Sequence, residues 1–151
     1  MNLSFGHVWP AFVARRKTVT RRFWKPSHAK KFVKGFEFDA LDTATFQGGQ
    51  KIGTGRMTVT AYQESLLDMP DEDYAGEGFT FLREFPCLIP SRAAKEIWAQ
   101  DRCSERSFRQ WRDQGSLLYV ARFEVLDVEP WAITHLNALL IANNHPPLRA
   151  N

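Results

Sequence analysis

Cysteine is scarce in this chain, which has only Cys87 and Cys103 among its 151 residues. The two form no Cys-x-x-Cys pair and have no neighbouring histidine, so they match no usual zinc spacing. The four histidines form no ligand pattern either. A chain of this length buries a core without disulfides or metals. We therefore expect no structural metal, no cofactor and a reducing, cytoplasmic location.

Long hydrophobic runs are also missing, because no apolar stretch approaches the 18 residues of a membrane span. The apolar run at residues 8–14 is followed by basic residues, whereas a signal peptide has them in front. We therefore expect no signal peptide and no membrane partner. No repeat or linker divides the chain, so a single domain over residues 1–151 is predicted, with its core at about 3–128 and a C-terminal helix and tail at 129–151.

Acidic residues are absent from residues 1–36, which hold nine Lys or Arg. The other 115 residues hold eleven basic and seventeen acidic residues. Such an asymmetry is typical of a protein that binds a phosphate-bearing ligand, and a solvated basic face is the alternative. We predict that six cations contact phosphates: Arg15, Arg16, Arg21, Arg22, Lys25 and Arg56.

Alternating apolar and polar residues predict strands, and the clearest such pattern is "SLLYVARFEVLDV" at residues 116–128. The other expected strands are at about 2–5, 18–23, 36–42 and 52–62. Strands at uneven spacing, with short helices between them, indicate an α+β fold built on a small, mostly antiparallel β-barrel. Five or six strands are expected.

Helical periodicity or capping residues predict short helices at about residues 9–16 and 70–77, and a C-terminal helix at 131–144. Residues 80–115 are predicted to form a helical insertion. Four arginines in the insertion are spaced to share one helix surface and are candidates to contact a phosphate chain: Arg102, Arg106, Arg109 and Arg112. A solvated helix face explains them equally well.

Three segments, in this order, resemble the ASCH domain, a relative of the PUA fold. They are "RRKTVTRR" at residues 15–22, "DMPDEDYAGEGF" at 68–79 and "LYVARFEVLDV" at 118–128. The resemblance spans most of residues 3–128. It implies a PUA-like barrel whose cleft, lined by the first helix and the Lys-Thr-x-Thr segment, receives nucleic acid or a nucleoside.

Some small members of that family are amidohydrolases that remove the acetyl group from N4-acetylcytidine with a lysine, a threonine and a glutamate. Carried over by position, these residues are Lys17, Thr20 and Glu77. The chain is longer than those minimal enzymes, because of the insertion and the segment after residue 129, which leaves the substrate open. Other members are described as ribonucleases or as non-catalytic binders of RNA or DNA, so the family alone does not select an activity.

Amide hydrolysis needs a nucleophile, a base that activates it and an acid for the leaving amine. Thr20, Lys17 and Glu77 can fill these roles, and partial burial beside four arginines predicts a lowered pKa for Lys17. An ideal strand places Lys17 and Thr20 on opposite faces. That objection weakens because Lys17 is expected at a helix-to-strand junction and has a long, flexible stem. Thr18 remains an alternative nucleophile.

Two other functions fit the residues. In a non-catalytic RNA-binding module, Lys17 and the arginines form a phosphate-binding strand end and Glu77 makes a cap or a salt bridge. A ribonuclease with a divalent metal would use acids such as Asp39, Asp42 and Glu64, which show no motif spacing. In each case the expected partner is RNA or a nucleoside.

Overall fold

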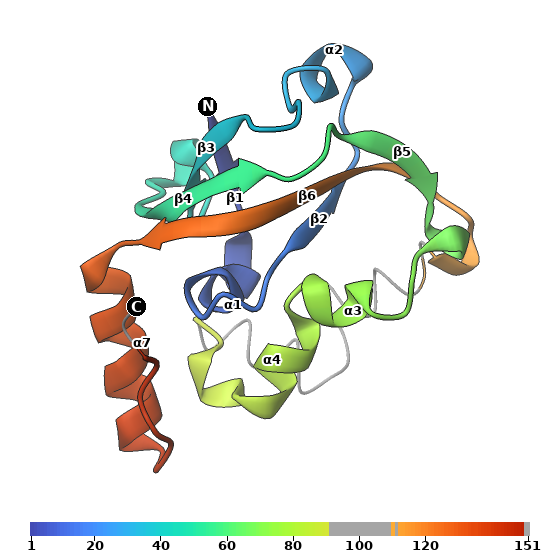
Figure 1. Ribbon diagram of the computed structural model, residues 1–151. Coiled ribbons are helices and arrows are strands. Elements are labelled where there is room, and N and C mark those ends of the chain that lie inside the picture. The colour runs from blue at the N-terminus through green and yellow to red at the C-terminus, as the bar shows by residue number, and fades with distance from the viewer. Residues whose placement is uncertain (91–109, 111, 150–151) are drawn as a thin grey trace.

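The strand predicted over residues 116–128 is β6, Leu117–Val128, and it organises the sheet. The computed structural model describes residues 1–90, 110 and 112–149, shown in Figure 1. The first half of β6 pairs with β5 (Tyr62–Ser65) on one edge and with β2 (Val19–Arg22) on the other. Its second half pairs with β4 (Lys51–Met57). One long strand thereby joins three shorter ones.

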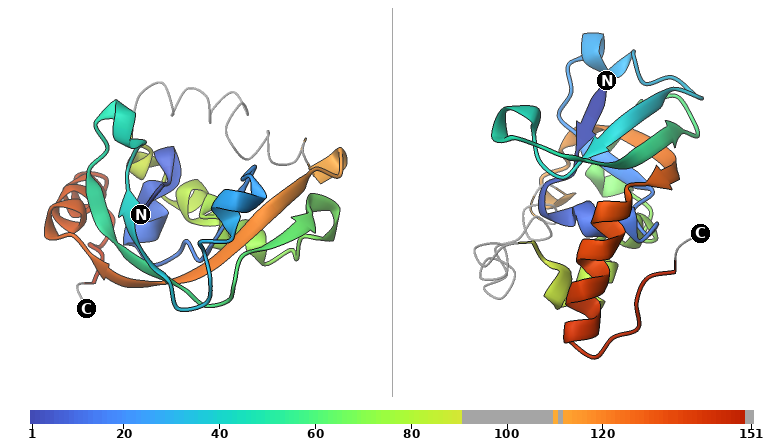
Figure 2. Two further views of the ribbon diagram at one scale, coloured as in Figure 1. Left: turned by 90° about the horizontal axis from the view of Figure 1, so that it is seen from above. Right: turned by 90° about the vertical axis from the view of Figure 1, so that its left-hand side faces the viewer.

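The sheet is mixed and curls into a half-barrel (Figures 1 and 2). Its order is β1-β3-β4-β6-β2, where β1 is Asn2–Ser4 and β3 is Glu37–Leu41. Only β1 and β3 are parallel among the strand pairs of the described residues. The α+β class and the mostly antiparallel sheet are therefore confirmed. The expected barrel is only half formed.

One predicted strand is divided. The alternating stretch at residues 52–62 ends as β4 at Met57, and β5 begins at Tyr62. Between them Thr58 and Ala61 bond through their amides to Arg122 and Phe32 instead of continuing a single ladder. The bend lets the chain follow the curl of the sheet from one part of β6 to the other.

The helices are short, apart from α7, Pro130–Ala142. The predicted helix at residues 70–77 is reduced to α3, Asp73–Gly76, and the prediction was wrong at its N-terminal end, where residues 70–72 form a turn. The other described helices are η1 (Gly6–Val8), α1 (Trp9–Val13), α2 (Pro26–Ala29), η2 (Thr45–Gln47), η3 (Leu66–Asp68), α4 (Phe79–Glu84) and η4 (Pro86–Leu88). No helix of the described residues has both the length and the apolar character needed to cross a membrane. Arg102, Arg106 and Arg109 of the predicted insertion lie outside the described residues.

Aromatic rings fill the concave side of the sheet, where α1 lies (Figure 2). Phe5 stacks on Phe12 of α1 with 5.2 Å between ring centroids, and both contact Phe123 of β6. Phe38 of β3 meets Phe123 edge to face at 5.4 Å. Such contacts stabilise a core beyond the area they bury. Much of the chain's aromatic content therefore serves the core.

Gly78 joins α3 to α4 at the point where α4 meets α1. Its φ is +99°, and a Cβ there would lie 2.7 Å from the Cβ of Ala11. We expect Gly78→Ala to lower the free energy of unfolding by about 1–3 kcal/mol, from backbone strain and the clash with Ala11. Denaturant unfolding measures the loss. Gly48→Ala is the control, because Gly48 also has positive φ (+77°) but no described atom lies within 4 Å of its built Cβ. Equal losses in the two variants would show that the clash costs nothing.

Candidate functional site

The edge of β2 meets α3 through a close backbone contact. The amide of Thr18 donates to the carbonyl of Gly76 at 2.9 Å. A Cβ on Gly76 would lie 2.9 Å from Cγ1 of Val19, so a glycine is what allows α3 to approach this closely. The contact brings side chains from residues 17–22 together with those from 73–77, although more than 50 residues separate the two segments.

Lys17 and Glu77 form a buried ion pair at this contact. Nζ of Lys17 lies 3.2 Å from Oε2 of Glu77, and the two side chains are 2% and 7% exposed. Nζ also donates to the carbonyls of Glu77 at 2.9 Å and Val19 at 3.0 Å. Burial lowers the pKa of Lys17, with help from Arg22 and Arg21, and the attraction of Glu77 opposes the change without cancelling it.

Thr20 is buried in the same neighbourhood. Its Oγ1 accepts a hydrogen bond from Nε of Arg22 at 3.1 Å. The Arg22 guanidinium and the Lys17 ammonium lie over the same Phe5 ring, 5.9 Å and 5.4 Å from its centroid. Lys17 precedes the first residue of β2, so the alternation of the strand does not force it to the face opposite Thr20.

Asp73 is the centre of a second buried group of charges. Arg122 binds it with two hydrogen bonds of 2.8 and 2.6 Å, and Nη2 of Arg21 lies 2.6 Å from Oδ2. Burial alone would raise the pKa of Asp73, but the hydrogen bonds from Arg122 and Arg21 outweigh burial and hold the pKa below its ordinary value. Arg122 also donates to the Tyr62 hydroxyl at 2.9 Å.

Arg21 connects the two groups. It contacts Glu64 at 2.8 Å, Asp73 at 2.6 Å and Glu77 at 3.4 Å, and its side chain is 1% exposed. The cluster therefore combines the buried Arg21, Asp73 and Glu77 with three partly exposed members, Arg22, Arg122 and Glu64. Lys17 is the fourth cation beside three carboxylates, and it is the fully buried amine whose pKa burial lowers.

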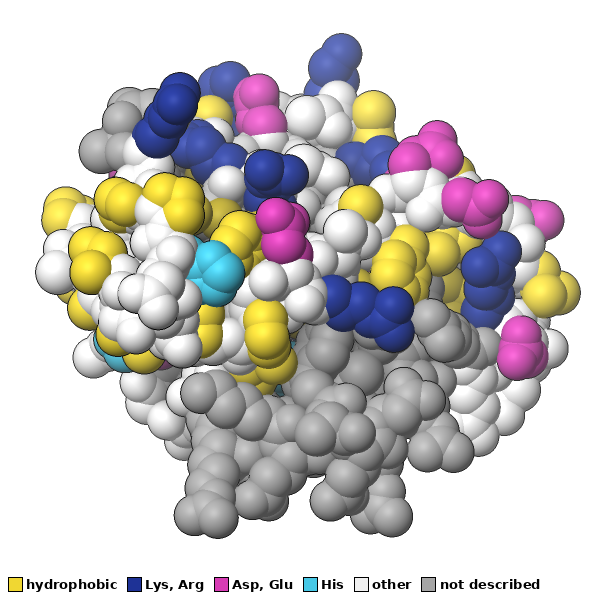
Figure 3. All heavy atoms as spheres, turned by 90° about the horizontal axis from the view of Figure 1, so that it is seen from below, with side chains coloured by type: hydrophobic (Ala, Val, Ile, Leu, Met, Phe, Trp, Pro, Cys, Tyr) yellow, Lys and Arg dark blue, Asp and Glu magenta, His cyan; other side chains and the backbone are white. Residues whose placement is uncertain are grey.

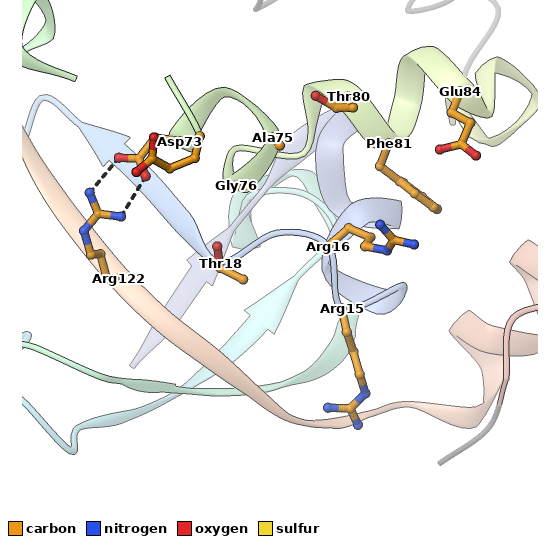
Figure 4. A pocket seen from close by; sticks show the side chains of 11 residues that line it. Arg15, Arg16, Thr18, Asp73, Ala75, Gly76, Thr80, Phe81, Glu84 and Arg122 are labelled. Carbon is orange, nitrogen blue, oxygen red and sulfur yellow. Dashed lines mark hydrogen bonds and ion pairs between the residues drawn. The ribbon is translucent and has the colours of Figure 1, made fainter. Parts of the chain in front are cut away.

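A pocket of about 490 Å³ lies next to the contact between Thr18, just before β2, and Gly76 of α3. Figure 4 shows Asp73 and Arg122 at one end of it, Arg16, Phe81 and Glu84 at the other, and Thr18 between them. Lys17, Thr20 and Glu77 do not line this pocket. The two candidate nucleophiles are thus separated, with Thr18 exposed at the pocket and Thr20 buried beside Arg22.

The six cations predicted to contact phosphates do not share one surface. Arg21 and Arg22 bond within the protein. Arg56 is exposed but lies 2.6 Å from Glu124, and Arg15 donates to the carbonyl of Val125. Arg16 and Lys25 are exposed, Arg16 at the pocket and Lys25 just before α2. The face in Figure 3 carries basic and acidic side chains side by side instead of one basic field.

The acids considered for a metal-dependent nuclease lie apart. Asp39 pairs with Lys51, Asp42 accepts hydrogen bonds from two nearby backbone amides, and Glu64 binds Arg21. Among the described residues, no three His, Cys, Asp or Glu side chains are placed to hold a metal ion. The ribonuclease alternative therefore finds no metal site at these three acids.

Sequence reasoning missed four members of the buried cluster. Asp73 was expected only as part of the helix at residues 70–77, Glu64 only among the acids of the ribonuclease alternative, and Arg122 only as part of its strand. His7 was expected at an ordinary position, yet it is half-buried, and burial followed by the charge of Lys17 lowers its pKa. The run of acids at residues 71–73 facing a strand rich in arginine was the signal available.

Comparisons with known proteins do not show a family for the chain. No family model and no curated protein matches the chain. Among solved structures, the chain is similar to the crystal structure of protein EF3133 from Enterococcus faecalis V583, family-model DUF984. The identity is 19%, the match covers 83% of this chain and 73% of that chain, and the TM-score is 0.49. At these values the likeness carries no inference about activity.

Proposed function

We propose that the chain is an ASCH-type, PUA-like domain that hydrolyses the amide of an acylated cytidine, N4-acetylcytidine in the simplest case. The observation that carries the proposal is the buried Lys17–Glu77 pair, 3.2 Å between Nζ and Oε2, formed by residues 60 positions apart. Thr20 is buried beside Arg22, which shares the Phe5 ring with Lys17. The proposal brings Thr20 into one site with this pair, and the shared contact of Lys17 and Arg22 with Phe5 is what supports that step.

The chemistry assigns one role to each residue. Oγ1 of Thr20 attacks the amide carbon while Lys17 takes the hydroxyl proton, as a base of lowered pKa can do. The proton passes from Lys17 to Glu77, its neighbour at 3.2 Å, and from there to the N4 nitrogen as the C–N bond breaks. Water then cleaves the acyl-threonine ester. One water is consumed, and cytidine and acetate are released.

Burial of the pair also fits a purely structural role, in which it holds α3 against β2. Conversion of N4-acetylcytidine to cytidine and acetate by the purified protein separates the two interpretations. Incubation with RNA, with and without EDTA, tests the ribonuclease alternative in the same experiment. Cleavage of RNA without conversion of the nucleoside would contradict the proposed hydrolysis.

A second candidate, RNA binding without catalysis, is favoured by four lysines at residues 25–34: Lys25, Lys30, Lys31 and Lys34. All four are exposed, and none makes an ion pair with a carboxylate of the described residues. Phe23, two residues before the first of them, is 62% exposed. Exposed lysines that bind no described carboxylate suit the phosphates of a single-stranded nucleic acid, and an exposed aromatic residue near them in the sequence suits its bases.

Replacing Lys30, Lys31 and Lys34 together by glutamine should weaken binding of single-stranded RNA and make it less sensitive to salt. Loss of three phosphate contacts reduces the slope of log K against log salt by about 2. Titrations at several salt concentrations measure it. Lys51→Gln is the control, because Lys51 is exposed on β4 but already paired with Asp39. An unchanged slope in the triple variant would exclude these lysines as the RNA contact.

A further inference from the structure

The two carboxylate oxygens of Glu77 have different partners. Oε2 faces Nζ of Lys17 at 3.2 Å, and Oε1 faces Nη1 of Arg21 at 3.4 Å. A carboxylate held at both oxygens has its plane fixed, since rotation about the terminal bond breaks one contact or the other. Arg21 therefore determines how Glu77 is presented to Lys17.

Arg21 itself is fixed from the opposite side. Its Nη2 contacts Asp73 at 2.6 Å and Glu64 at 2.8 Å, and Asp73 is in turn held by two hydrogen bonds from Arg122. Glu64 is on β5, Asp73 on α3 and Arg122 on β6, so three elements determine the position of one guanidinium. The planar fork of arginine makes such a set of contacts, which the single ammonium of lysine cannot reproduce.

One side-chain nitrogen of Arg21 takes part in none of these contacts. Its Nε is the buried side-chain polar atom of the described residues that lacks a hydrogen-bond partner. An unpaired buried donor costs stability. Arg21 therefore makes its contacts with Glu77 and Asp73 while one of its own donors stays unpaired.

We propose that Arg21 is a positioning residue, which orients the Glu77 carboxylate toward Lys17 and offsets its negative charge so that Lys17 can act as a base. This inference rests on the proposed function for its catalytic meaning. Sequence alone assigned Arg21 to phosphate. Its burial and its three carboxylate partners assign it to Glu77 instead.

The charge on Lys17 is set by groups from several elements. Glu77, at the end of α3, favours the protonated amine, whereas Arg21 and Arg22 of β2 disfavour it. His7 of η1 is the titratable neighbour on the remaining side, and its own pKa responds to Lys17. Glu64 acts through Arg21, which it neutralises in part. Removing Arg21 leaves Glu77 uncompensated, so Lys17 should bind its proton more tightly.

The test follows the Lys17 signal in protein labelled with ¹³C at lysine Cε, assigned by its loss in Lys17→Met, as the pH is raised. Arg21→Gln should raise the pKa of Lys17, on the order of one pH unit. The acid limb of kcat/KM for N4-acetylcytidine should move to higher pH by the same amount. Glu64→Gln, which leaves Arg21 less neutralised, should move both in the opposite direction. Arg21→Lys keeps the charge but not the fork, so kcat should fall roughly tenfold or more with little movement of the profile.

The variants separate this inference from the proposed function. If the unmodified protein does not hydrolyse N4-acetylcytidine, the proposed function fails, and the Lys17 signal still judges the role of Arg21. If hydrolysis occurs but Arg21→Gln leaves both the pKa of Lys17 and the pH profile of kcat/KM unchanged, the proposal that Arg21 is a positioning residue is wrong. Should Arg21→Gln not fold, the shift in Glu64→Gln decides, since Glu64 makes a single contact with Arg21 at the edge of the cluster. A shift in the same direction in both glutamine variants also overturns the proposal.

Discussion

Replacing Lys17 by methionine should lower the turnover of N4-acetylcytidine by at least about 100-fold, because the base and the nucleophile act as a unit. Thr20→Ala should lose a similar factor. Methionine keeps most of the apolar stem and removes the ammonium that lies over Phe5, while Glu77 keeps its contact with Arg21, so the variant should still fold. Steady-state rates measure the loss, and a thermal melt followed by circular dichroism checks the fold.

Thr18→Ala is the matched control for the nucleophile. Thr18 is exposed at the pocket and its side chain is one of those that line it, whereas Thr20 is buried near Lys17. We expect Thr18→Ala to keep most of the turnover. An inactive Thr18→Ala with an active Thr20→Ala would move the nucleophile to Thr18, and with it the reaction from the buried cluster to the pocket.

Replacing Asp73 by alanine should cost about 3–5 kcal/mol of unfolding free energy, because it leaves the guanidinium groups of Arg21 and Arg122 without their shared carboxylate. Urea unfolding measures the change. Glu124→Ala is the control: Glu124 also pairs with an arginine, Arg56, but both side chains are more than 40% exposed. Exposed pairs contribute at most about 1 kcal/mol. Equal losses in the two variants would show that the Asp73 cluster does not stabilise the fold.

The same carboxylate makes stability depend on pH. The pKa of Asp73 lies below its ordinary 3.8, so its contribution is fully present above that value and is lost as the pH falls through the lower, folded-state pKa. Asp73→Asn should therefore flatten the acid limb of the stability curve.

Lys17 has a separate effect on stability at higher pH. Because its pKa is lowered in the folded state, the free energy of unfolding rises as the pH increases from that lowered pKa toward the ordinary 10.5.

Local patterns in the sequence predicted most of the strands, since alternation in β6 or β3 reports directly which face is buried. The extent of the curl was not predictable, because it depends on bulges such as the register shift between Thr54 and Gly55. The helix expected at residues 70–77 was shortened for a related reason. Acids at 71–73 suit a helix start, yet Asp73 is drawn into ion pairs with β2 and β6 instead.

In the site, too, local patterns predicted which residues take part but not which residues from distant parts of the chain they contact. The family motifs selected Lys17, Thr20 and Glu77, and the structure pairs Lys17 with Glu77 and buries Thr20 beside Arg22. Arg21 and Arg22 are adjacent in sequence and were expected to contact phosphate together. Neighbours on a strand point to opposite sides, so Arg21 meets the carboxylates while Arg22 meets Phe5 and Thr20. No pattern in the sequence specifies the carboxylates that bind Arg21, because they lie 40 or more residues away on β5 and α3.

The central claim is that the buried Lys17–Glu77 pair and Thr20 hydrolyse an acylated cytidine. The most direct measurement is chromatography of N4-acetylcytidine after incubation with the purified protein and, in parallel, with Lys17→Met. The account predicts equal amounts of cytidine and acetate from the unmodified protein and at least about 100-fold less from the variant. Cytidine formed equally fast by both proteins, or by neither, would contradict it.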